Sequence, residues 1–306
     1  MDARILELPF DAASLKGLSE KLLRSHHQNN YSGAVKRLNA IRAQLRDLPF
    51  ASTPGFELNG LKREELIATN SMLLHELYFE SLCADGQAME PAMSLALETN
   101  FGSVDRWRDE FVAMGKALGG GSGWVLLVFQ PREGTLVNQW CADHTHALAG
   151  GIPLLALDMY EHAYHLDFGA AAGAYVDAFM ASIDWARVYR RYQGAVHAAS
   201  ESFGATHGDA ADALLLDVRR AGVFEKADSM LAGARWCDPG KVSTWAVELP
   251  KDREVVVYCV YGHEVGRATA MRLRAAGVRA RYLEGGIDAW KAAGRPLVAK
   301  PAGGVP

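Results

Sequence analysis

The stretch DMYEHAYHLDFG, residues 158–169, places an aspartate and a histidine four positions apart, with Glu161 just before the histidine. If the stretch is helical, Asp158 and His162 share a face, because side chains at i and i+4 are neighbours on a helix. A carboxylate oxygen and an imidazole nitrogen that meet at one point suggest a metal ion. The alternative is an amphipathic segment with a solvated Asp158 and a hydrogen-bonded His162, so any further ligands must come from elsewhere.

Two helical patterns earlier in the chain each carry a histidine beside apolar residues. Residues 12–45 and 63–82 have apolar positions at helical spacing, and PFASTPGFELNG between them has the composition of a loop. We expect the two helices to form an antiparallel hairpin. His26 and His75 each follow a pair of leucines, where an unpaired imidazole would be costly to bury. Each is therefore either a hydrogen-bonded core histidine or a ligand.

The rest of this first region mixes helices with a few strands. SLALETNFGSVDRWRDEFVAMGKAL predicts two helices, with Ser103 as the N-cap of the second. Three strands are then expected, with PREG as a hairpin turn between the first two: Trp124–Phe129, Thr135–Trp140 and Pro153–Asp158. Helix is expected to return over 159–192. The region as a whole is predicted to be an α-helical hairpin followed by an α+β part with a small antiparallel sheet.

The composition changes after this region. YQGAVHAASESFGATHGDAADA is rich in Ala, Gly and Ser, which favours a linker. Beyond it, the strand-like segments ALLLDV, VVVYCV and VRARYL alternate with helical ones, which predicts an α/β domain with a parallel sheet. We therefore expect a domain over residues 1–194, a linker over 195–206 and a second domain over 207–300.

Composition and charge exclude several classes of protein. The formal net charge of -4 gives no basic surplus, so nucleic acid is not an expected partner. No apolar run approaches the roughly 18 residues of a transmembrane helix, and the first residues lack the pattern of a secretory signal. The four cysteines are scattered and form no CxxC pair, so neither a disulfide framework nor a cysteine zinc site is expected. These features predict a cytoplasmic protein without a membrane partner.

Five segments, taken in order, resemble the iron/manganese superoxide dismutases over roughly residues 5–192: ELPF, SHHQNNYSGAVKRLN, NSMLLHELYFESL, GSGWVLLV and DMYEHAY. The resemblance implies an antioxidant oxidoreductase that converts superoxide to dioxygen and hydrogen peroxide. It also implies one Fe or Mn ion per chain with four ligands: His26, His75, Asp158 and His162. Three imidazoles and one carboxylate form a mixed N/O set that suits either metal in two oxidation states, so the choice between Fe and Mn stays open.

The same resemblance assigns residues around the metal. Trp124 matches an active-site tryptophan, and Tyr160 lies beside the last two ligands. The family places a Gln or a His near the metal to orient solvent. DHTHALAGGIPLL resembles the versions with a His, which makes His144 the first choice for this role and His146 the reserve.

Other positions bear on assembly and access to the metal. Glu161 resembles the residue that bridges to a ligand of the partner subunit, which implies a homodimer or a tetramer. Stepping along an α-helix from His26 reaches Asn30 and then Ala34, where many family members have a His and a gateway Tyr. Asn30 and His165 are expected to form a polar bridge across the dimer instead. The missing tyrosine predicts retained metal binding with slower dismutation.

The C-terminal segments LLLDVR, CVYGHEVGRATAMRLRAAGV and LEGGIDAWKAAGRPL resemble a rhodanese-like domain over roughly residues 207–299. Cys259 ends a strand and faces a helix N-terminus, a place that favours a thiolate. The resemblance implies a Cys259 persulfide held by the amides of residues 260–265, which passes sulfur from a donor to an acceptor thiol. Glu264 is expected to repel anionic donors. The alternative is a thiol redox sensor or sulfurtransferase whose first domain serves as a metal-bearing dimerisation module.

Overall fold

The computed structural model describes residues 2–301 and divides into two compact units. The first unit contains residues 2–89, 108–128 and 138–188, and the second contains residues 90–107, 129–137 and 189–301. Each unit has buried apolar clusters of its own. Over residues 2–301, no helix combines the length and apolar character that a membrane span requires.

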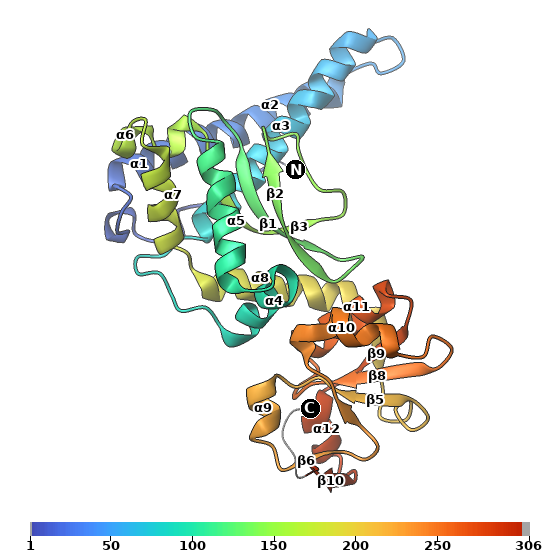
Figure 1. Cartoon of the computed structure of the whole chain (residues 1–306). Helices are drawn as coiled ribbons and strands as arrows, with labels where there is room; N and C mark the ends of the chain where they lie inside the picture. The colour runs from blue at the N-terminus through green and yellow to red at the C-terminus, as the bar shows by residue number, and fades with distance from the viewer. Residues whose placement is uncertain (1, 302–306) are drawn as a thin grey trace. The chain divides into compact units, whose positions relative to one another are not determined.

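The first unit begins with a helical hairpin, as predicted. Its elements, in chain order, are η1 (Ala12–Ser14), α1 (Glu20–Ser25), the π-helix η2 (His26–Tyr31), α2 (Ser32–Asp47) and α3 (Gly55–Glu80). Figure 1 shows α2 and α3 side by side. Leu38 and Ile41 of α2 pack with Ala68 of α3 in a buried cluster. α3 begins at Gly55, directly after Pro54, so the helix is longer than the sequence pattern indicated.

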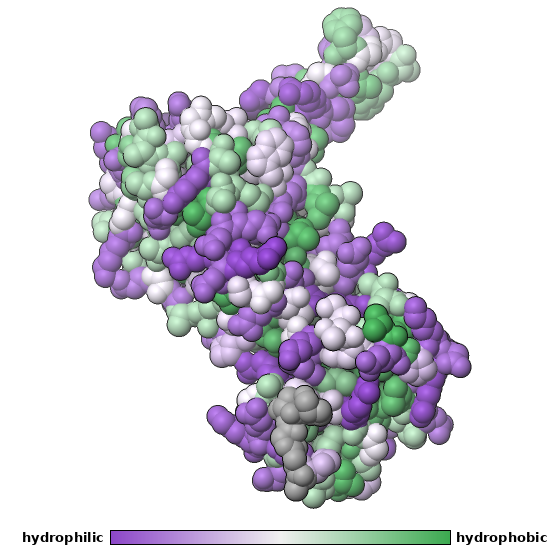
Figure 2. Space-filling model, viewed as in Figure 1, coloured by the Kyte–Doolittle hydropathy of each residue, from purple (hydrophilic) through white to green (hydrophobic). Residues whose placement is uncertain are grey.

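The connection between α2 and α3 exposes apolar side chains. Figure 2 shows hydrophobic residues at this end of the hairpin, where Phe50 and Phe56 are 58% and 83% exposed. The buried contacts between the two helices lie further along the hairpin, toward residues that hold the predicted ligands.

A short antiparallel sheet follows two helices. The elements are α4 (Pro91–Phe101), α5 (Val104–Ala117), β1 (Trp124–Gln130), β2 (Thr135–Cys141) and β3 (Ile152–Asp158). The strand order is β2-β1-β3. Ser103 caps α5, since its hydroxyl accepts a hydrogen bond from the Arg106 N–H. The backbone of α5 lies close to the sheet at Gly115, where a Cβ would stand 2.8 Å from Leu157.

The prediction of helix over 159–192 is wrong in its first part. β3 ends at Asp158, and shorter elements follow: the 3₁₀ turn η3 (Glu161–Ala163), α6 (His165–Phe168), α7 (Ala172–Ala181) and α8 (Trp185–Ser200). Gly169 has a φ of 53°, which ends α6. Asp158 and His162 therefore converge from a strand end and a 3₁₀ turn rather than from one helix face.

The second unit contains a parallel sheet of the predicted α/β kind. Its strands are β4 (Gly204–Ala205), β5 (Leu214–Asp217), β7 (Arg235–Trp236), β8 (Glu254–Tyr258) and β9 (Arg279–Leu283). They pair in parallel in the order β4-β9-β8-β5-β7. The apolar run Val255–Tyr258 is fully buried, as expected for a strand covered on both faces.

Several smaller elements complete this unit. They are α9 (Ala221–Glu225), β6 (Ser229–Leu231), η5 (Pro239–Lys241), α10 (Val242–Trp245), η6 (Ala246–Glu248), α11 (Glu264–Ala275), α12 (Gly286–Ala292) and β10 (Leu297–Ala299). β6 and β10 form a separate antiparallel pair. The segment 195–206 is structured rather than an open linker: α8 continues to Ser200, η4 (Glu201–Phe203) follows, and β4 pairs with β9.

Candidate metal centre

Four side chains converge in the first unit: His26 from η2, His75 from α3, Asp158 from the end of β3 and His162 from η3. Their ligand atoms all lie within 4.8 Å of one another. Asp158 Oδ2 stands 3.1, 3.5 and 3.2 Å from the Nε2 atoms of His26, His75 and His162. We call these four residues the ligand cluster. Three of them are buried, and His162 is partly exposed.

The hydrogen bonds of the ligand cluster leave donor atoms free for a metal. His75 Nδ1 donates to the carbonyl oxygen of Ser71 at 2.6 Å, so Nε2 carries a lone pair. Within residues 2–301, His75 Nε2 is a buried nitrogen without a hydrogen-bond partner. Such an atom is costly to bury unless something binds it. The donor set therefore fits an Fe or Mn ion.

The electrostatics of the ligand cluster favour neutral imidazoles beside an ionised carboxylate. Burial lowers the pKa of His26, and burial together with the neighbouring His26 lowers the pKa of His75 to about 3. Burial opposes ionisation of Asp158, but its interactions with His162 and His26 outweigh burial and hold its pKa below the ordinary value. Metal ligands must be deprotonated, so His26, His75 and Asp158 are in the state that binding needs.

His144 lies beside the ligand cluster. Its Nδ1 accepts a hydrogen bond from Trp124 Nε1 at 2.9 Å, which leaves the proton on Nε2. Its ring stacks on Tyr160 with centroids 4.8 Å apart, and Tyr160 stacks on His162 at 5.4 Å. Burial lowers the pKa of His144, so the ring is neutral at physiological pH. The reserve choice, His146, is exposed and contacts Asp143 instead.

The π-helix η2 changes which residues share a face with His26. The prediction stepped along an ideal α-helix to Asn30 and Ala34, whereas η2 has the wider i→i+5 hydrogen bonds of a π-helix, so the α-helical face of His26 does not continue through it. Tyr31 is buried, and its hydroxyl donates to Glu76 at 2.9 Å and accepts from the Leu6 N–H at 2.8 Å. Because the Tyr31 hydroxyl already makes these two hydrogen bonds, it does not take the place of the missing gateway tyrosine. The α-helical assumption for this segment is wrong.

The positions assigned to a subunit contact lie toward the surface of this chain. Glu161 and His165 are exposed, and Asn30 is partly exposed. Their role across a dimer stays a prediction.

The residues 259–266, called the Cys259 loop below, form a second candidate site. Burial raises the pKa of the Cys259 thiol, while the backbone N–H groups of residues 261–263 and Gly266 favour its thiolate. An added Cβ at Gly266 would lie 3.3 Å from Cys259 Sγ, so the helix backbone meets the sulfur directly. Three of these amides belong to the predicted set of 260–265, and that of Gly266 lies just after it. Glu264 does not stand as a free anion, because donors on α8 bind its carboxylate.

Sequence reasoning missed several residues that support the two sites. Ser71 holds His75, and its position one helical turn earlier could have identified it. Tyr189 and Gln193 bind Glu264 from far along the sequence, so no local pattern reveals them. Asp217 and Arg219 form a buried ion pair. Both lie within the quoted segment LLLDVR, but their pairing was not predicted from the sequence.

Comparisons with known proteins match the two regions separately. Residues 89–191 match the model for the C-terminal domain of iron/manganese superoxide dismutases, and residues 204–293 match the rhodanese-like domain. The iron superoxide dismutase of Cupriavidus metallidurans is 65% identical over 186 residues, which is 61% of this chain and 94% of the relative.

More distant relatives include both metal types. The manganese superoxide dismutase 1 of Haloferax volcanii is 33% identical over 198 residues, covering 64% of this chain and 97% of its own length. The iron superoxide dismutase of Aquifex pyrophilus is 34% identical over 193 residues, covering 60% and 89%. The rhodanese-like match at residues 204–293 lies outside the superoxide dismutase match at residues 89–191.

Proposed function

Because the chain belongs to the iron/manganese superoxide dismutase family and carries a rhodanese-like domain, we propose that it dismutates superoxide to dioxygen and hydrogen peroxide. The ligand cluster would hold one Fe or Mn ion. The observation that carries this proposal is the convergence of its four donor atoms within 4.8 Å in a buried site. When bound, the ion supplies a redox centre that accepts an electron from one superoxide and gives it to another.

The chain's own residues prepare the site for this chemistry. The Ser71 carbonyl fixes His75 with a free Nε2, and Asp158 contributes the one negative charge among the donors. The Trp124 N–H fixes His144 with its proton on Nε2, where it can hydrogen-bond to solvent or to an incoming anion. The two protons of hydrogen peroxide come from solvent, which the His144 N–H beside the ligand cluster would orient.

Substitution of the ligands tests the assignment. His75→Ala and Asp158→Asn are each expected to lose bound metal and dismutation together, because removal of a ligand leaves an incomplete donor set. His146→Asn serves as the control, since His146 is exposed and contacts Asp143. Metal content should be measured by elemental analysis and dismutation by a superoxide assay. Full metal content in both ligand variants would refute the ligand assignment.

A second activity, sulfur transfer through Cys259, is supported by the ring of backbone N–H groups around its sulfur. The thiolate would attack the outer sulfur of a persulfide or thiosulfonate donor. A Cys–S–S bond forms, and the donor's remainder leaves with the electron pair. An acceptor thiolate then takes the outer sulfur and returns the Cys259 thiolate. Mass spectrometry should detect one added sulfur atom on the wild-type chain and none on Cys259→Ser; an unmodified wild type with every donor would refute the proposal.

We place the protein in a reducing cytoplasm, as a homodimer or tetramer. All four cysteines are free thiols in the structure, which agrees with that compartment. Exposed Glu161 and His165 flank the ligand His162 and are the residues proposed to reach a partner subunit. Sedimentation of the wild type and of Glu161→Ala tests this: the variant should shift toward monomer, and an unchanged assembly would remove Glu161 from the interface.

A further inference from the structure

Glu264, the first residue of α11, is a carboxylate buried in the second unit at 5% exposure. Both of its oxygens accept hydrogen bonds from α8. Tyr189 OH donates to Oε1 at 2.7 Å, and Gln193 Nε2 donates to Oε2 at 3.1 Å. Tyr189 and Gln193 are four residues apart, so they present their donors from one helix face. A buried carboxylate without donors is strongly disfavoured, and these two bonds therefore fix Glu264.

The same face of α8 continues beside the Cys259 loop. The ring of His197 lies 5.8 Å from the ring of His263, and Ser200 Oγ accepts a hydrogen bond from Arg267 Nη1 at 3.3 Å. Arg267 Nε in turn donates to the Gly262 carbonyl at 2.8 Å. Helix α8 thus contacts the loop and the first turn of α11 at several points.

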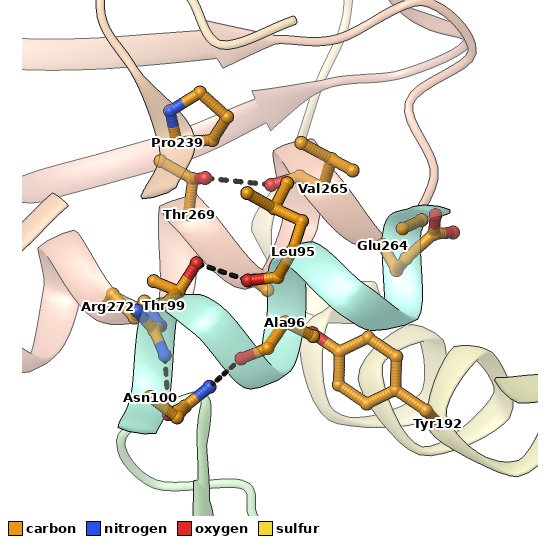
Figure 3. A pocket seen from close by; sticks show the side chains of 12 residues that line it. Leu95, Ala96, Thr99, Asn100, Tyr192, Pro239, Glu264, Val265, Thr269 and Arg272 are labelled. Atoms are coloured by element: carbon orange, nitrogen blue, oxygen red, sulfur yellow. Dashed lines mark hydrogen bonds between the residues drawn. The ribbon is translucent and has the colours of Figure 1, made fainter. Parts of the chain in front are cut away.

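The far end of α11 is held from α4. Arg272 donates to Asn100 Oδ1 at 2.5 Å and to the Gly134 carbonyl at 3.2 Å. Figure 3 shows Glu264 and Arg272 on α11 at opposite ends of the pocket that α4 and Tyr192 complete. This pocket holds only about 30 Å³, enough for a water molecule and not for a substrate. The contact is a packed support for α11 rather than a binding site.

We propose that Tyr189 and Gln193 are positioning residues for sulfur transfer. By binding Glu264, they hold the Cys259 loop with its backbone N–H groups around the sulfur. This inference rests on the proposed sulfur transfer through Cys259. Glu264 lies in the chain between His263 and Gly266, two residues whose N–H groups favour the thiolate, so movement of Glu264 moves the sulfur site. A segment within the dismutase match thereby supports the chemistry of the rhodanese-like domain.

The role of the Glu264 bonds can be separated from the role of its charge. Glu264→Gln removes the charge but keeps the shape: its amide oxygen can accept from Gln193, and its NH2 can donate to the Tyr189 hydroxyl. Glu264→Ala removes the charge and both hydrogen bonds. If the bonds position the loop, Glu264→Gln retains sulfur transfer. Glu264→Ala loses both bonds and at least about tenfold in kcat, since the loss of even one hydrogen bond to a charged group has that effect. If the charge merely repels anionic donors, both variants are faster than the wild type.

The test measures sulfur transfer from thiosulfate to cyanide by the full chain, with kcat and KM determined separately. The double variant Tyr189→Phe/Gln193→Leu should match Glu264→Ala, with kcat reduced and KM unchanged. Adding Glu264→Ala to the double variant should cost nothing more, because the two changes break the same bonds. Ala198→Ser, at an exposed position of α8, is the matched control. Unchanged superoxide dismutation and metal content show that the first unit of each variant is folded, and an unchanged circular dichroism spectrum shows that the second unit keeps its fold.

A second measurement keeps the inference testable if no donor transfers sulfur to Cys259 of the wild type. The alkylation rate of Cys259 by iodoacetamide, resolved by peptide mass spectrometry, should rise several-fold in Glu264→Ala and in the double variant, because a loosened loop exposes the buried thiol. It should stay at the wild-type value in Glu264→Gln and Ala198→Ser. Equal alkylation rates in all variants, or additive losses of kcat, would overturn the inference. A wild type that never transfers sulfur but shows this alkylation pattern would refute only the transfer.

Discussion

At the scale of single residues, the metal centre depends on which nitrogen of each imidazole is free. The bond from His75 Nδ1 to the Ser71 carbonyl leaves Nε2 facing Asp158. The hydrogen bond from Trp124 to His144 Nδ1 means that the ring proton of the neutral His144 is on Nε2. These two bonds leave His75 Nε2 able to bind a metal and His144 Nε2 able to donate a hydrogen bond.

Removal of the Trp124 donor tests the second of these bonds. Trp124→Phe keeps an aromatic ring but leaves His144 without the bond that fixes its tautomer. We expect metal content to be unchanged and dismutation per metal to fall by about tenfold, as for other residues that orient groups beside a metal. The measurement is superoxide turnover divided by bound Fe plus Mn. Turnover equal to that of the wild type would mean that the Trp124–His144 bond has no part in the reaction.

The buried imidazoles also predict how stability depends on pH. The folded chain holds the pKa of His75 at about 3, against 6.5 for the ordinary value, and burial lowers that of His26 as well. Between about pH 3 and pH 6.5, the unfolded chain binds more protons than the folded chain. The free energy of unfolding of the metal-free protein therefore falls as the pH drops below about 6.5, by up to about 1.4 kcal/mol per pH unit for each imidazole.

Urea unfolding of the metal-free protein from about pH 8 to about pH 5 measures this slope. His75→Ala should be less steep than the wild type, because one of the titrating groups is gone. A free energy of unfolding that stays constant or rises on acidification would contradict the buried neutral imidazoles.

At the scale of elements, the sequence predicted the fold well and the local geometry of the site less well. The ligand histidines were identified by motif resemblance, and strands β1 to β3 by apolar runs between turn residues. The π-helix η2 was not predictable, because an i→i+5 turn carries no propensity of its own and depends on tertiary packing. The strand end at Asp158 was predicted, but the 3₁₀ turn that follows it was predicted as helix, since a four-residue spacing fits both.

The close packing of α5 on the sheet gives a prediction about an element. Gly115→Ala would place a Cβ 2.8 Å from Leu157 and 3.2 Å from Val176, both fully buried. We expect the free energy of unfolding to fall by about 1–2 kcal/mol, because this overpacking exceeds the gain in helix propensity. Gly60→Ala in α3, which meets nothing within 4 Å, is the control and should stabilise by about 0.5–1 kcal/mol. Urea unfolding of both variants measures these changes in the free energy of unfolding. A Gly115→Ala variant more stable than the wild type would contradict the close packing of α5 on the sheet.

At the scale of the whole molecule, one chain carries two reactive sites in two units. The ligand cluster lies in the first unit and Cys259 in the second. The domain boundary over residues 195–206 stays a prediction. Composition did not reveal that α8 continues to Ser200 within this segment or that α8 binds Glu264 far along the chain. The hydrogen bond from Tyr189 to Glu264 joins residues far apart in the sequence, so no local pattern could predict it.

The two sites are expected to act independently. Cys259→Ser should keep full superoxide dismutation, and His75→Ala should keep sulfur transfer, since the two residues belong to different units. Both activities are measured on both variants. A loss of dismutation in Cys259→Ser would instead show that the thiol takes part in the reaction with superoxide.

The central claim is that the ligand cluster makes this chain a metal-dependent superoxide dismutase. The most direct test is superoxide turnover by the purified protein as its Fe or Mn content is raised from zero. The account predicts that turnover rises in proportion to bound metal and levels off at one ion per chain. A protein that binds one ion per chain in the ligand cluster and yet leaves superoxide untouched would contradict it.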